Sequence, residues 1–404
     1  MPTTLHKKIA IIGTDGLPAN YGGFETLAEH LVKNLSDNYD LTVYCTKRNY
    51  PKENQPAMYG KAKLVYFGLD ANGIQSIPYD TLSIIHSLLY ADVLLILGVA
   101  GAWILPFVRL FTKKKIIISI DGAELKRNKW SLPARWYLSW AEKIAVKYSH
   151  INISDNESIQ DNAAVRYGSR SIEFGANHIL EVSPSKEDTE KYPFLKMPYA
   201  VKVCRIEPEN NVHEVLEAFS QLPRHSMVII GNWKNSSYGK LLWEKYSSFR
   251  NLILLDPICD ERTLDLIRGN ALLYVHGHSA GGTNPSLLEA MYLGLPIFAF
   301  GVSYNRTTTE QKARYFQNAA DLKTLIEKTS ILELKEMGST MKEIAERRYT
   351  WEVIAGKYQL LIEETLSQKI KVNVATGFSN LPLPRADHHE MDYLQYQNAF
   401  FENA

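Results

Sequence analysis

The chain has 404 residues, more than a single hydrophobic core usually holds, so its length predicts two domains of similar size. Its composition, 45% hydrophobic and 22% charged, excludes a chain that is disordered throughout. The 45 Lys and Arg residues nearly cancel the 44 Asp and Glu residues, which excludes a general electrostatic attraction to nucleic acid.

Short β-branched runs alternate with helical patterns in the first half of the chain. Continuous apolar strands separated by helices are typical of a parallel sheet that is covered on both faces. This pattern predicts a doubly wound α/β domain over residues 1–180. Its predicted strands are 8–14, 41–45, 63–67, 92–98, 115–121 and 151–154.

The same alternation restarts later and predicts a second α/β domain over 199–350. Residues 181–198 are polar and charged and contain three prolines, which is typical of a linker. A capped amphipathic helix is predicted over 351–370, and we expect 371–404 to be a peripheral or partly disordered tail. The predicted strands of the second domain are 199–205, 227–231, 252–256, 271–276 and 296–300.

Cysteine usage and hydropathy favour a cytoplasmic protein. The three cysteines lie far apart without metal-ligand spacing, and an odd number argues against a disulfide framework. The first residues lack an apolar signal core, and no run reaches the roughly 18 apolar residues of a membrane span.

Ligands of parallel sheets bind at the carboxyl ends of strands, so we searched the loops that follow strands. The first such loop brings Gly22 and Gly23 to the start of a helix, where their backbone amides can approach a phosphate or a sugar. Glu25, a candidate for catalysis, is at the same helix start, where the helix dipole favours an acid in any case. A flexible turn is the alternative, because the loop lacks the glycine fingerprint of dinucleotide-binding proteins.

The second loop, 120–130, follows a predicted buried strand and contains Asp121, Lys126 and Arg127. Charged residues at the end of such a strand face the ligand side of the sheet. Asp121 is therefore a candidate for catalysis, and the two basic residues are candidates for the acceptor or phosphate side. An ordinary Asp-Gly turn is the alternative.

The third loop, 204–211, follows the first strand of the second domain and contains Arg205. A guanidinium there can form a charge-assisted clamp on a diphosphate. An ion pair between Arg205 and Glu207 or Glu209 is the alternative.

The fourth loop precedes a helix that begins at Pro285. Glu289 lies about one turn inside this helix, where a carboxylate can accept hydrogen bonds from ribose hydroxyls while the helix N-terminus faces phosphate. His276 and His278 alternate on the preceding strand, but no third ligand is evident, so we expect no metal site. The donor-binding candidates in the loop itself are Gly281, Gly282, Thr283 and Asn284.

These four loops carry the motifs of a known family. The segments GLPANYGGFET at 16–26, DGAELKRNKW at 121–130, CRIEPENN at 204–211 and GGTNPSLLEAM at 281–291 occur in that order. On these motifs the chain resembles the retaining GT-B glycosyltransferases of family 4 over roughly its first 366 residues. Within that family it is most similar to the rhamnosyltransferase-like branch, which the segment YNRTT at 304–308 also matches.

The resemblance implies two Rossmann-like domains that face each other across a cleft, with the acceptor on the first and the nucleotide sugar on the second. The helix at 351–370 is then expected to cross back to the first domain. Arg205 is expected to contact the diphosphate and Glu289 the ribose, while the glycine loop before Glu289 supplies backbone contacts. Asp121 would orient the acceptor or act as a weak base in place of the family's histidine.

Two positions depart from the family pattern. Gly281 stands where the family has an acid, eight residues before Glu289, and Asn210 stands where it has a diphosphate-binding lysine. We therefore expect Asn210 to lie in a donor site of altered charge, with Arg205, the helix dipole and Arg306 meeting the charge of the donor.

The implied function is transfer of L-rhamnose from dTDP-L-rhamnose, with retention, to a lipid-linked or oligosaccharide acceptor in surface polysaccharide synthesis. No metal or other cofactor is expected. Another donor, such as a UDP-hexose, and a nonenzymatic subunit that only binds a sugar nucleotide are the alternatives that stay open. A dehydrogenase is a poor fit, because neither half carries the dinucleotide fingerprint.

The apolar segment that begins at Trp103 is followed by Lys113, Lys114 and Lys115. An apolar surface beside basic residues suits anionic lipid headgroups and a lipid-diphosphate acceptor. An ordinary core helix with a basic end is the alternative. The sequence thus leaves open whether this cytoplasmic protein touches the inner face of the membrane through 103–115.

Overall fold

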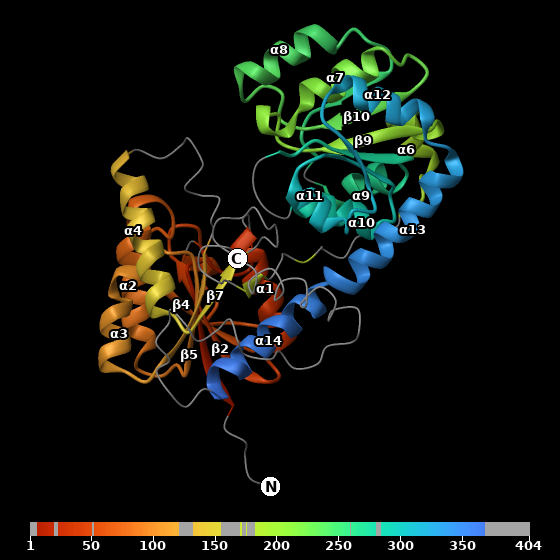
Figure 1. The fold of residues 1–404 in the computed structure, drawn as a ribbon. Coiled ribbons are helices and arrows are strands. Elements are labelled where there is room, and N and C mark those ends of the chain that lie inside the picture. Colours follow the sequence, from red (N-terminus) through yellow and green to blue (C-terminus); the bar gives the residue numbers. More distant parts are fainter. Residues whose placement is uncertain are drawn as a thin grey trace, which may run out of the picture. The chain divides into compact units, whose positions relative to one another are not determined.

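The structure is a computed structural model of the chain. It describes residues 6–19, 23–50, 52–120, 132–154, 170–171, 175, 182–258, 260–279 and 284–367. These residues form two compact units, one with the described residues up to 171 and from 354 onward, the other with those from 175 to 353 (Figure 1). The predicted tail, 371–404, lies outside the described residues.

The first unit is built on an eight-stranded sheet with the order β3-β4-β2-β1-β5-β6-β7-β8. All neighbouring strands are parallel except β3 and β4. The strands are β1 (Lys7–Ile12), β2 (Tyr39–Thr46), β3 (Met58–Tyr59), β4 (Ala62–Phe67), β5 (Val93–Leu97), β6 (Lys115–Ser119), β7 (Ile151–Ser154) and β8 (Arg170–Ser171).

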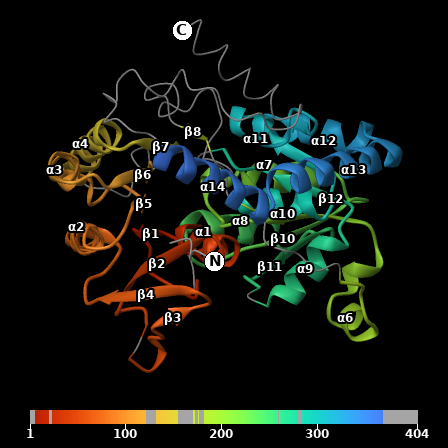
Figure 2. The same ribbon diagram turned by 90° about the horizontal axis from the view of Figure 1, so that it is seen from below.

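Helices cover both faces of this sheet. One face carries α2 (Ser76–Ser87), α3 (Leu105–Phe111) and α4 (Leu132–Tyr148), as Figures 1 and 2 show. The other carries α1 (Gly23–Leu35) and the end of α14 (Trp351–Ser367). Short 3-10 helices are η1 (Lys52–Asn54), η2 (Gly73–Gln75) and η3 (Ala102–Ile104).

The second unit has a six-stranded sheet with the order β11-β10-β9-β12-β13-β14, in which all neighbours are parallel. Its central strands are buried and mostly apolar, as residues 227–230 of β10 with the sequence MVII show. The strands are β9 (Tyr199–Val203), β10 (Ser226–Ile230), β11 (Leu252–Leu255), β12 (Leu273–His276), β13 (Ile297–Phe300) and β14 (Arg314–Phe316).

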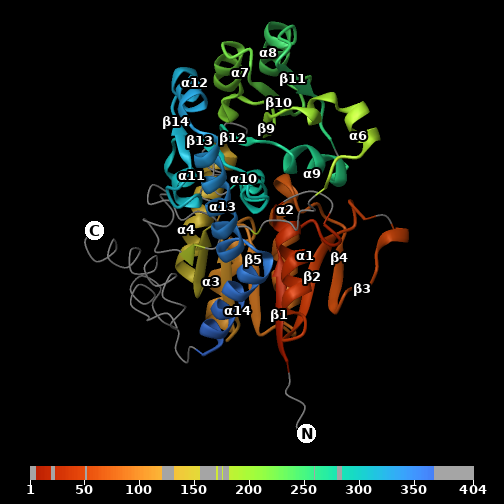
Figure 3. The ribbon, with the colours of Figure 1, turned by 90° about the vertical axis from the view of Figure 1, so that its right-hand side faces the viewer.

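Figures 1 and 3 show the helices of this unit on the two faces of the sheet. On one face lie α7 (Val212–Ser220), α8 (Ser237–Tyr246) and α12 (Ala319–Lys328). On the other lie α9 (Glu261–Gly269), α10 (Pro285–Tyr292) and α11 (Ser303–Thr308), and α13 (Ile331–Arg348) packs against α10. The remaining short elements are α6 (Lys186–Lys191), η5 (Pro193–Lys196) and η6 (Pro208–Asn210).

The doubly wound α/β class predicted from the sequence is confirmed. The predicted strands match the observed ones to within one or two residues at each end, and the sequence pattern missed the short strands β3, β8 and β14. Within the described residues, none of the helices combines the length and the apolar composition that crossing a bilayer requires.

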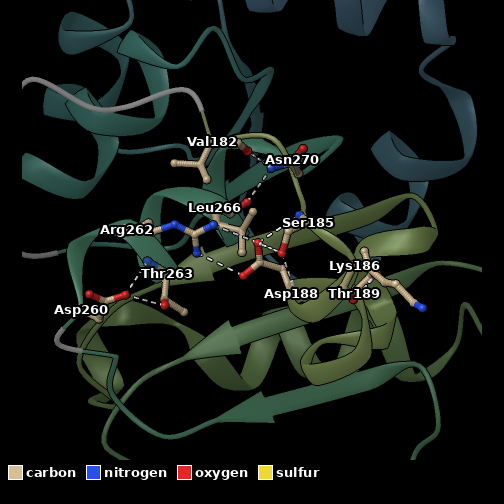
Figure 4. Close-up of polar contacts among 10 residues, drawn as sticks. All are labelled: Val182, Ser185, Lys186, Asp188, Thr189, Asp260, Arg262, Thr263, Leu266 and Asn270. Atoms are coloured by element: carbon tan, nitrogen blue, oxygen red, sulfur yellow. Dashed lines mark hydrogen bonds and ion pairs between the residues drawn. The ribbon is translucent and has the colours of Figure 1, made fainter.

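Part of the predicted linker, 181–198, is ordered structure of the second unit. Ser185 and Asp188 form a capping box at the start of α6, and Asp188 also accepts hydrogen bonds of 3.1 and 2.9 Å from Arg262 of α9 (Figure 4). Asn270 donates a 2.8 Å hydrogen bond to the carbonyl of Val182. The composition of this segment indicated a linker, and the structure gives Asp188 a partner in a helix about 75 residues further along the chain.

Candidate functional site

The sheet of the second unit has a switch point between β9 and β12. The chain passes from β9 to β10 on one side of β9, whereas β12 lies on its other side. At such a point, open parallel sheets bind ligands in the crevice outside the carboxyl ends of the two strands. The loops that leave these carboxyl ends contain Arg205 and Gly277, and they include the third and fourth segments singled out in the sequence.

Hydrogen bonds join the two loops at this switch point. Asn211 donates a 2.8 Å hydrogen bond to the carbonyl of Gly277, and the backbone N–H of Ser279 donates one of 2.8 Å to the carbonyl of Glu209. The side chain of Asn210 donates to the Arg205 carbonyl at 2.9 Å, and its oxygen lies 3.0 Å from Nδ1 of His278. Asn210, a predicted donor-binding residue, is thus buried and connects the loops.

Arg205 extends from this framework toward solvent. Its side chain is 57% exposed, and its closest acid is Glu207, with 3.6 Å between Nη1 and Oε2. An exposed ion pair of this kind contributes little free energy, so the guanidinium can exchange Glu207 for a phosphate at small cost. The ion pair that the sequence left open therefore exists and is compatible with binding a diphosphate.

The helix α10 begins beside the same crevice. Asn284 caps it, because the side-chain oxygen accepts a 3.0 Å hydrogen bond from the N–H of Ser286, and Pro285 occupies its first turn. Glu289 lies further along this helix and pairs through Oε2 with Arg268 of α9. Nη2 of Arg268 is 2.9 Å from Oδ1 of Asp265, and both of these side chains are almost fully buried.

The sequence analysis missed Arg268. Its position gives a carboxylate–guanidinium–carboxylate chain that fixes the Glu289 side chain, and the two acids keep the pKa of the guanidinium above its ordinary value despite burial. The only local signal was the Asp265–Arg268 spacing within one helix, because the contact with Glu289 joins two different helices.

Arg306, a predicted donor-binding residue, lies in α11, the helix that follows β13. Its guanidinium carbon is 4.1 Å from the centre of the Tyr315 ring, and its Nε is 3.4 Å from the carbonyl oxygen of Gly301. Stacking on an aromatic ring fixes the guanidinium plane. Its neighbour Asn305 donates a 2.9 Å hydrogen bond to the His278 carbonyl, which links α11 to the switch-point loops.

The first unit has its own switch point, between β1 and β5. The loop after β1 is the first segment singled out in the sequence, and Gly23 is the first residue of the helix that follows it. Oε1 of Glu25 accepts a 2.8 Å hydrogen bond from the backbone N–H of Asp15, so this candidate for catalysis holds the loop. Burial raises the pKa of Glu25.

The loop after β5 at this switch point covers a carboxyl that the sequence analysis also missed. Asp80 of α2 is 97% buried beneath Gly101, and its Oδ1 has no hydrogen-bond partner among the described residues. Burial raises the pKa of Asp80 to about 8. A carboxyl at this depth is neutral near pH 7.

Several predicted site residues lie outside the described residues. They are Gly22, Asp121, Lys126, Arg127, Gly281, Gly282 and Thr283. Across the parts of the chain that the structure describes, no group of three His, Cys, Asp or Glu side chains is arranged to hold a metal ion.

The two α/β units, each with loops gathered at a switch point, have the fold of the GT-B glycosyltransferases. Comparison with family models matches residues 185–348 to Glycosyl transferases group 1, so the second unit contains a domain of that family. Residues 6–177 match the Domain of unknown function (DUF1972). No curated protein matches the chain.

Solved structures support the same fold. The chain is similar to sucrose-phosphate synthase (tll1590) from Thermosynechococcus elongatus, with 17% identity, a TM-score of 0.70, and coverage of 89% of this chain and 99% of that one. A glycosyltransferase from Rickettsia africae ESF-5 has 14% identity, a TM-score of 0.66, and coverage of 90% and 100%. Anabaena Alr3699/HepE, solved in complex with UDP, has 14% identity, a TM-score of 0.64, and coverage of 89% and 100%.

Proposed function

We propose that the chain is a glycosyltransferase that binds a nucleotide diphosphate sugar in its second unit and transfers the sugar to an acceptor bound by its first unit. The observation that carries this proposal is the switch point between β9 and β12, where an exposed Arg205 and the capped helix of Glu289 flank one crevice of the glycosyl transferases group 1 domain. A guanidinium and a helix N-terminus suit a diphosphate, and a fixed carboxylate suits ribose hydroxyls.

For the donor, we propose dTDP-L-rhamnose. Oε2 of Glu289 pairs with Arg268, whereas Oε1 forms no hydrogen bond or ion pair with a described residue, so Oε1 can accept a hydrogen bond from a hydroxyl. The deoxyribose of dTDP offers the nucleotide's 3′-hydroxyl alone. Gly281 stands where the family has an acid, so the sugar end of the donor site lacks that carboxylate. This favours a deoxysugar such as rhamnose, which has one hydroxyl fewer than a hexose.

The second candidate is a UDP-hexose as donor. Its support is the structure of Anabaena Alr3699/HepE in complex with UDP, a protein with a similar fold. A panel of dTDP-rhamnose, dTDP-glucose, UDP-glucose and UDP-galactose with a lipid-linked monosaccharide acceptor separates the candidates. Transfer of rhamnose alone supports the first, and transfer of a hexose from UDP replaces it with the second.

We propose that transfer proceeds with retention and without a bound metal. Arg205, the N-terminus of α10 and Arg306 would stabilise the charge that develops on the leaving diphosphate. Asp121 would orient the acceptor hydroxyl, and Glu25 would keep the loop after β1 in place through Asp15. Full activity after EDTA treatment is the expected result, and activity restored only by Mg²⁺ or Mn²⁺ would contradict this part of the proposal.

A nonenzymatic subunit that binds a sugar nucleotide is the alternative from another class. It would bind dTDP or UDP, yet transfer no sugar from any donor to any acceptor of the panel. The glycosyltransferase proposal expects both binding and turnover, so one experiment distinguishes them.

We propose further that the first unit contacts the inner face of the membrane, where a lipid-linked acceptor would lie. The support is an exposed apolar surface on α2, α3 and α4, three helices on one face of the sheet (Figure 2). Tryptophan and phenylalanine are favoured at the interface of a bilayer, and exposed lysines such as Lys113 and Lys143 suit anionic headgroups. The exposed apolar side chains are Leu82, Ile85, Leu89, Trp103, Phe107, Leu110, Phe111, Trp136 and Trp140.

Sedimentation with vesicles tests the membrane contact. Binding to vesicles that contain anionic lipid, and weaker binding after replacement of Lys113, Lys114 and Lys115 by Gln, is the expected result. Absence of binding by the unchanged chain would overturn the proposal. The segment 103–111, which the sequence left open as a core helix, buries Leu105 and Val108. Its exposed large apolar side chains, in line with the proposal, are Trp103, Phe107, Leu110 and Phe111.

A further inference from the structure

Two polar side chains are buried beneath the switch-point loops of the second unit. Lys202 of β9 is 1% exposed, and His276 of β12 is 3% exposed. Among the residues that the structure describes, Nε2 of His276 has no hydrogen-bond partner, and no hydrogen bond or ion pair joins the Lys202 ammonium to another residue. The two strands that flank the switch point thus each bury one polar group that has no partner within the described part of the chain.

The Lys202 ammonium lies against the turn that follows β12. A Cβ placed on Gly277 would come within 2.8 Å of Nζ of Lys202 and would collide with the carbonyl oxygen of Asn210. Nζ is therefore next to the point where the two switch-point loops meet, directly below the backbone that links the Arg205 loop to the His278 loop.

Within the described residues, no carboxylate forms an ion pair with the Lys202 ammonium. Burial lowers the pKa of Lys202, and Cys204, whose own pKa burial raises, is the group with the largest opposing influence. Burial together with the neighbouring Lys202 and His278 holds the pKa of His276 well below its ordinary range. A buried ammonium without a counter-ion lowers the stability of the fold, unless a ligand supplies the missing charge.

The site offers one such ligand. A nucleoside diphosphate in the crevice between β9 and β12 brings about two negative charges to the loops above Lys202. Arg205 is exposed to solvent and meets this charge from the surface side, whereas Lys202 approaches from the side of the core, where little water screens it.

We propose that Lys202 is a second cation for the diphosphate of the donor, acting from beneath the turn at Gly277, and that His276 is its uncharged neighbour. The proposal rests on the proposed binding of a nucleotide diphosphate sugar by the second unit. It adds a residue that the sequence motifs do not include, because Lys202 stands inside a strand.

Lys202→Met tests the proposal, because it keeps the length of the side chain and removes the charge. Calorimetric titration with dTDP and UDP is expected to show a dissociation constant at least tenfold higher than that of the unchanged chain. Binding of thymidine and uridine, followed by ligand-detected NMR, is expected to stay within about twofold. Lys328→Met is the matched control, since Lys328 is an exposed lysine on α12 of the same unit, and it is expected to leave both affinities unchanged.

Thermal unfolding of the same variants separates binding from folding. Without ligand, Lys202→Met is expected to unfold at the same or a higher temperature, because an unpaired buried charge has been removed. Lys202→Gln, which retains a polar end without charge, is expected to lose diphosphate affinity in the same way. Loss of the fold in both variants would contradict the proposal, since it would give Lys202 a structural part.

Two further outcomes are decisive. If the unchanged chain binds dTDP or UDP and both Lys202 variants bind equally well, the inference fails while the proposed function stands. If the unchanged chain binds neither nucleotide, the proposed donor site and the inference fail together.

Discussion

Arg268 provides the sharpest test of how the second unit holds Glu289. Its guanidinium lies between Asp265 and Glu289 with only 5% of its side chain exposed, so the three groups form one buried charge network. Arg268→Met keeps much of the side-chain volume and leaves the two carboxylates without the cation between them.

The expected loss of stability follows from removing one partner of a buried ion pair. Removal of one partner of such a pair lowers the free energy of unfolding by about 3–5 kcal/mol. For a unit of this size, that loss lowers the melting temperature by about 6–20 °C. We also expect the dissociation constant for dTDP or UDP to rise about tenfold, because Glu289 loses the contact that orients it.

Calorimetric melting at pH 7 and titration with the nucleotide measure both effects. Arg314→Met is the matched control, because Arg314 pairs with Glu333 at 3.1 Å with both side chains about half exposed, and its cost is expected to stay below about 1 kcal/mol. Adding Glu289→Gln to Arg268→Met is expected to restore part of the lost stability, since one uncompensated carboxylate disappears. A loss for Arg268→Met no larger than that of the control would refute the network.

Three further outcomes are expected. Burial raises the pKa of Asp80 to about 8, against an ordinary value of about 3.9. Its neutral carboxyl therefore favours the folded state fully at low pH, and the free energy of unfolding falls by about 4 kcal/mol as the pH rises from 5 to 8. Melting curves of Asp80→Asn should lack that part of the pH dependence, and a curve that parallels the unchanged chain would contradict the buried neutral carboxyl. Gly277→Ala should lower the free energy of unfolding by about 1–3 kcal/mol, because the new methyl group collides with the Asn210 carbonyl; a neutral effect in chemical denaturation would show that the two loops are not in contact. Replacing Phe107 and Phe111 together by Ser should weaken sedimentation with anionic vesicles without lowering the melting temperature, and equal sedimentation would argue for a surface that no membrane covers.

The strands and the class of fold were predictable because their signals are local. Runs such as 227–230 are apolar at every position, which is the pattern of a strand buried on both faces. The short β3, β8 and β14 have two or three residues each, too few for a pattern to emerge. The ordered part of 181–198 was missed because its stability comes from Arg262, far along the chain.

The candidate site was predictable only in part. Arg205 lies in the loop after β9, and Glu289 lies about one turn inside the helix that follows β12. Their positions at the ligand edge of the sheet therefore follow from the alternation of elements. Arg268 holds Glu289 through a contact between two helices, and its only local signal was its spacing from Asp265. Lys202, which we propose as a second cation, stands inside a strand and outside the motifs. The strand order brings the loops after β9 and β12 together at a switch point. It depends on how distant strands pair, so the local sequence does not predict it.

The central claim is that Glu289 contacts the ribose of a nucleotide diphosphate bound at the switch point of the second unit. Titration of dTDP and UDP into the unchanged chain, Glu289→Ala and the exposed control Glu327→Ala tests it directly, with circular dichroism to verify the fold. A hydrogen bond to a carboxylate predicts a rise of about 10–100-fold in the dissociation constant for Glu289→Ala and no change for Glu327→Ala. An equal affinity of the folded Glu289→Ala variant for both nucleotides would contradict the claim.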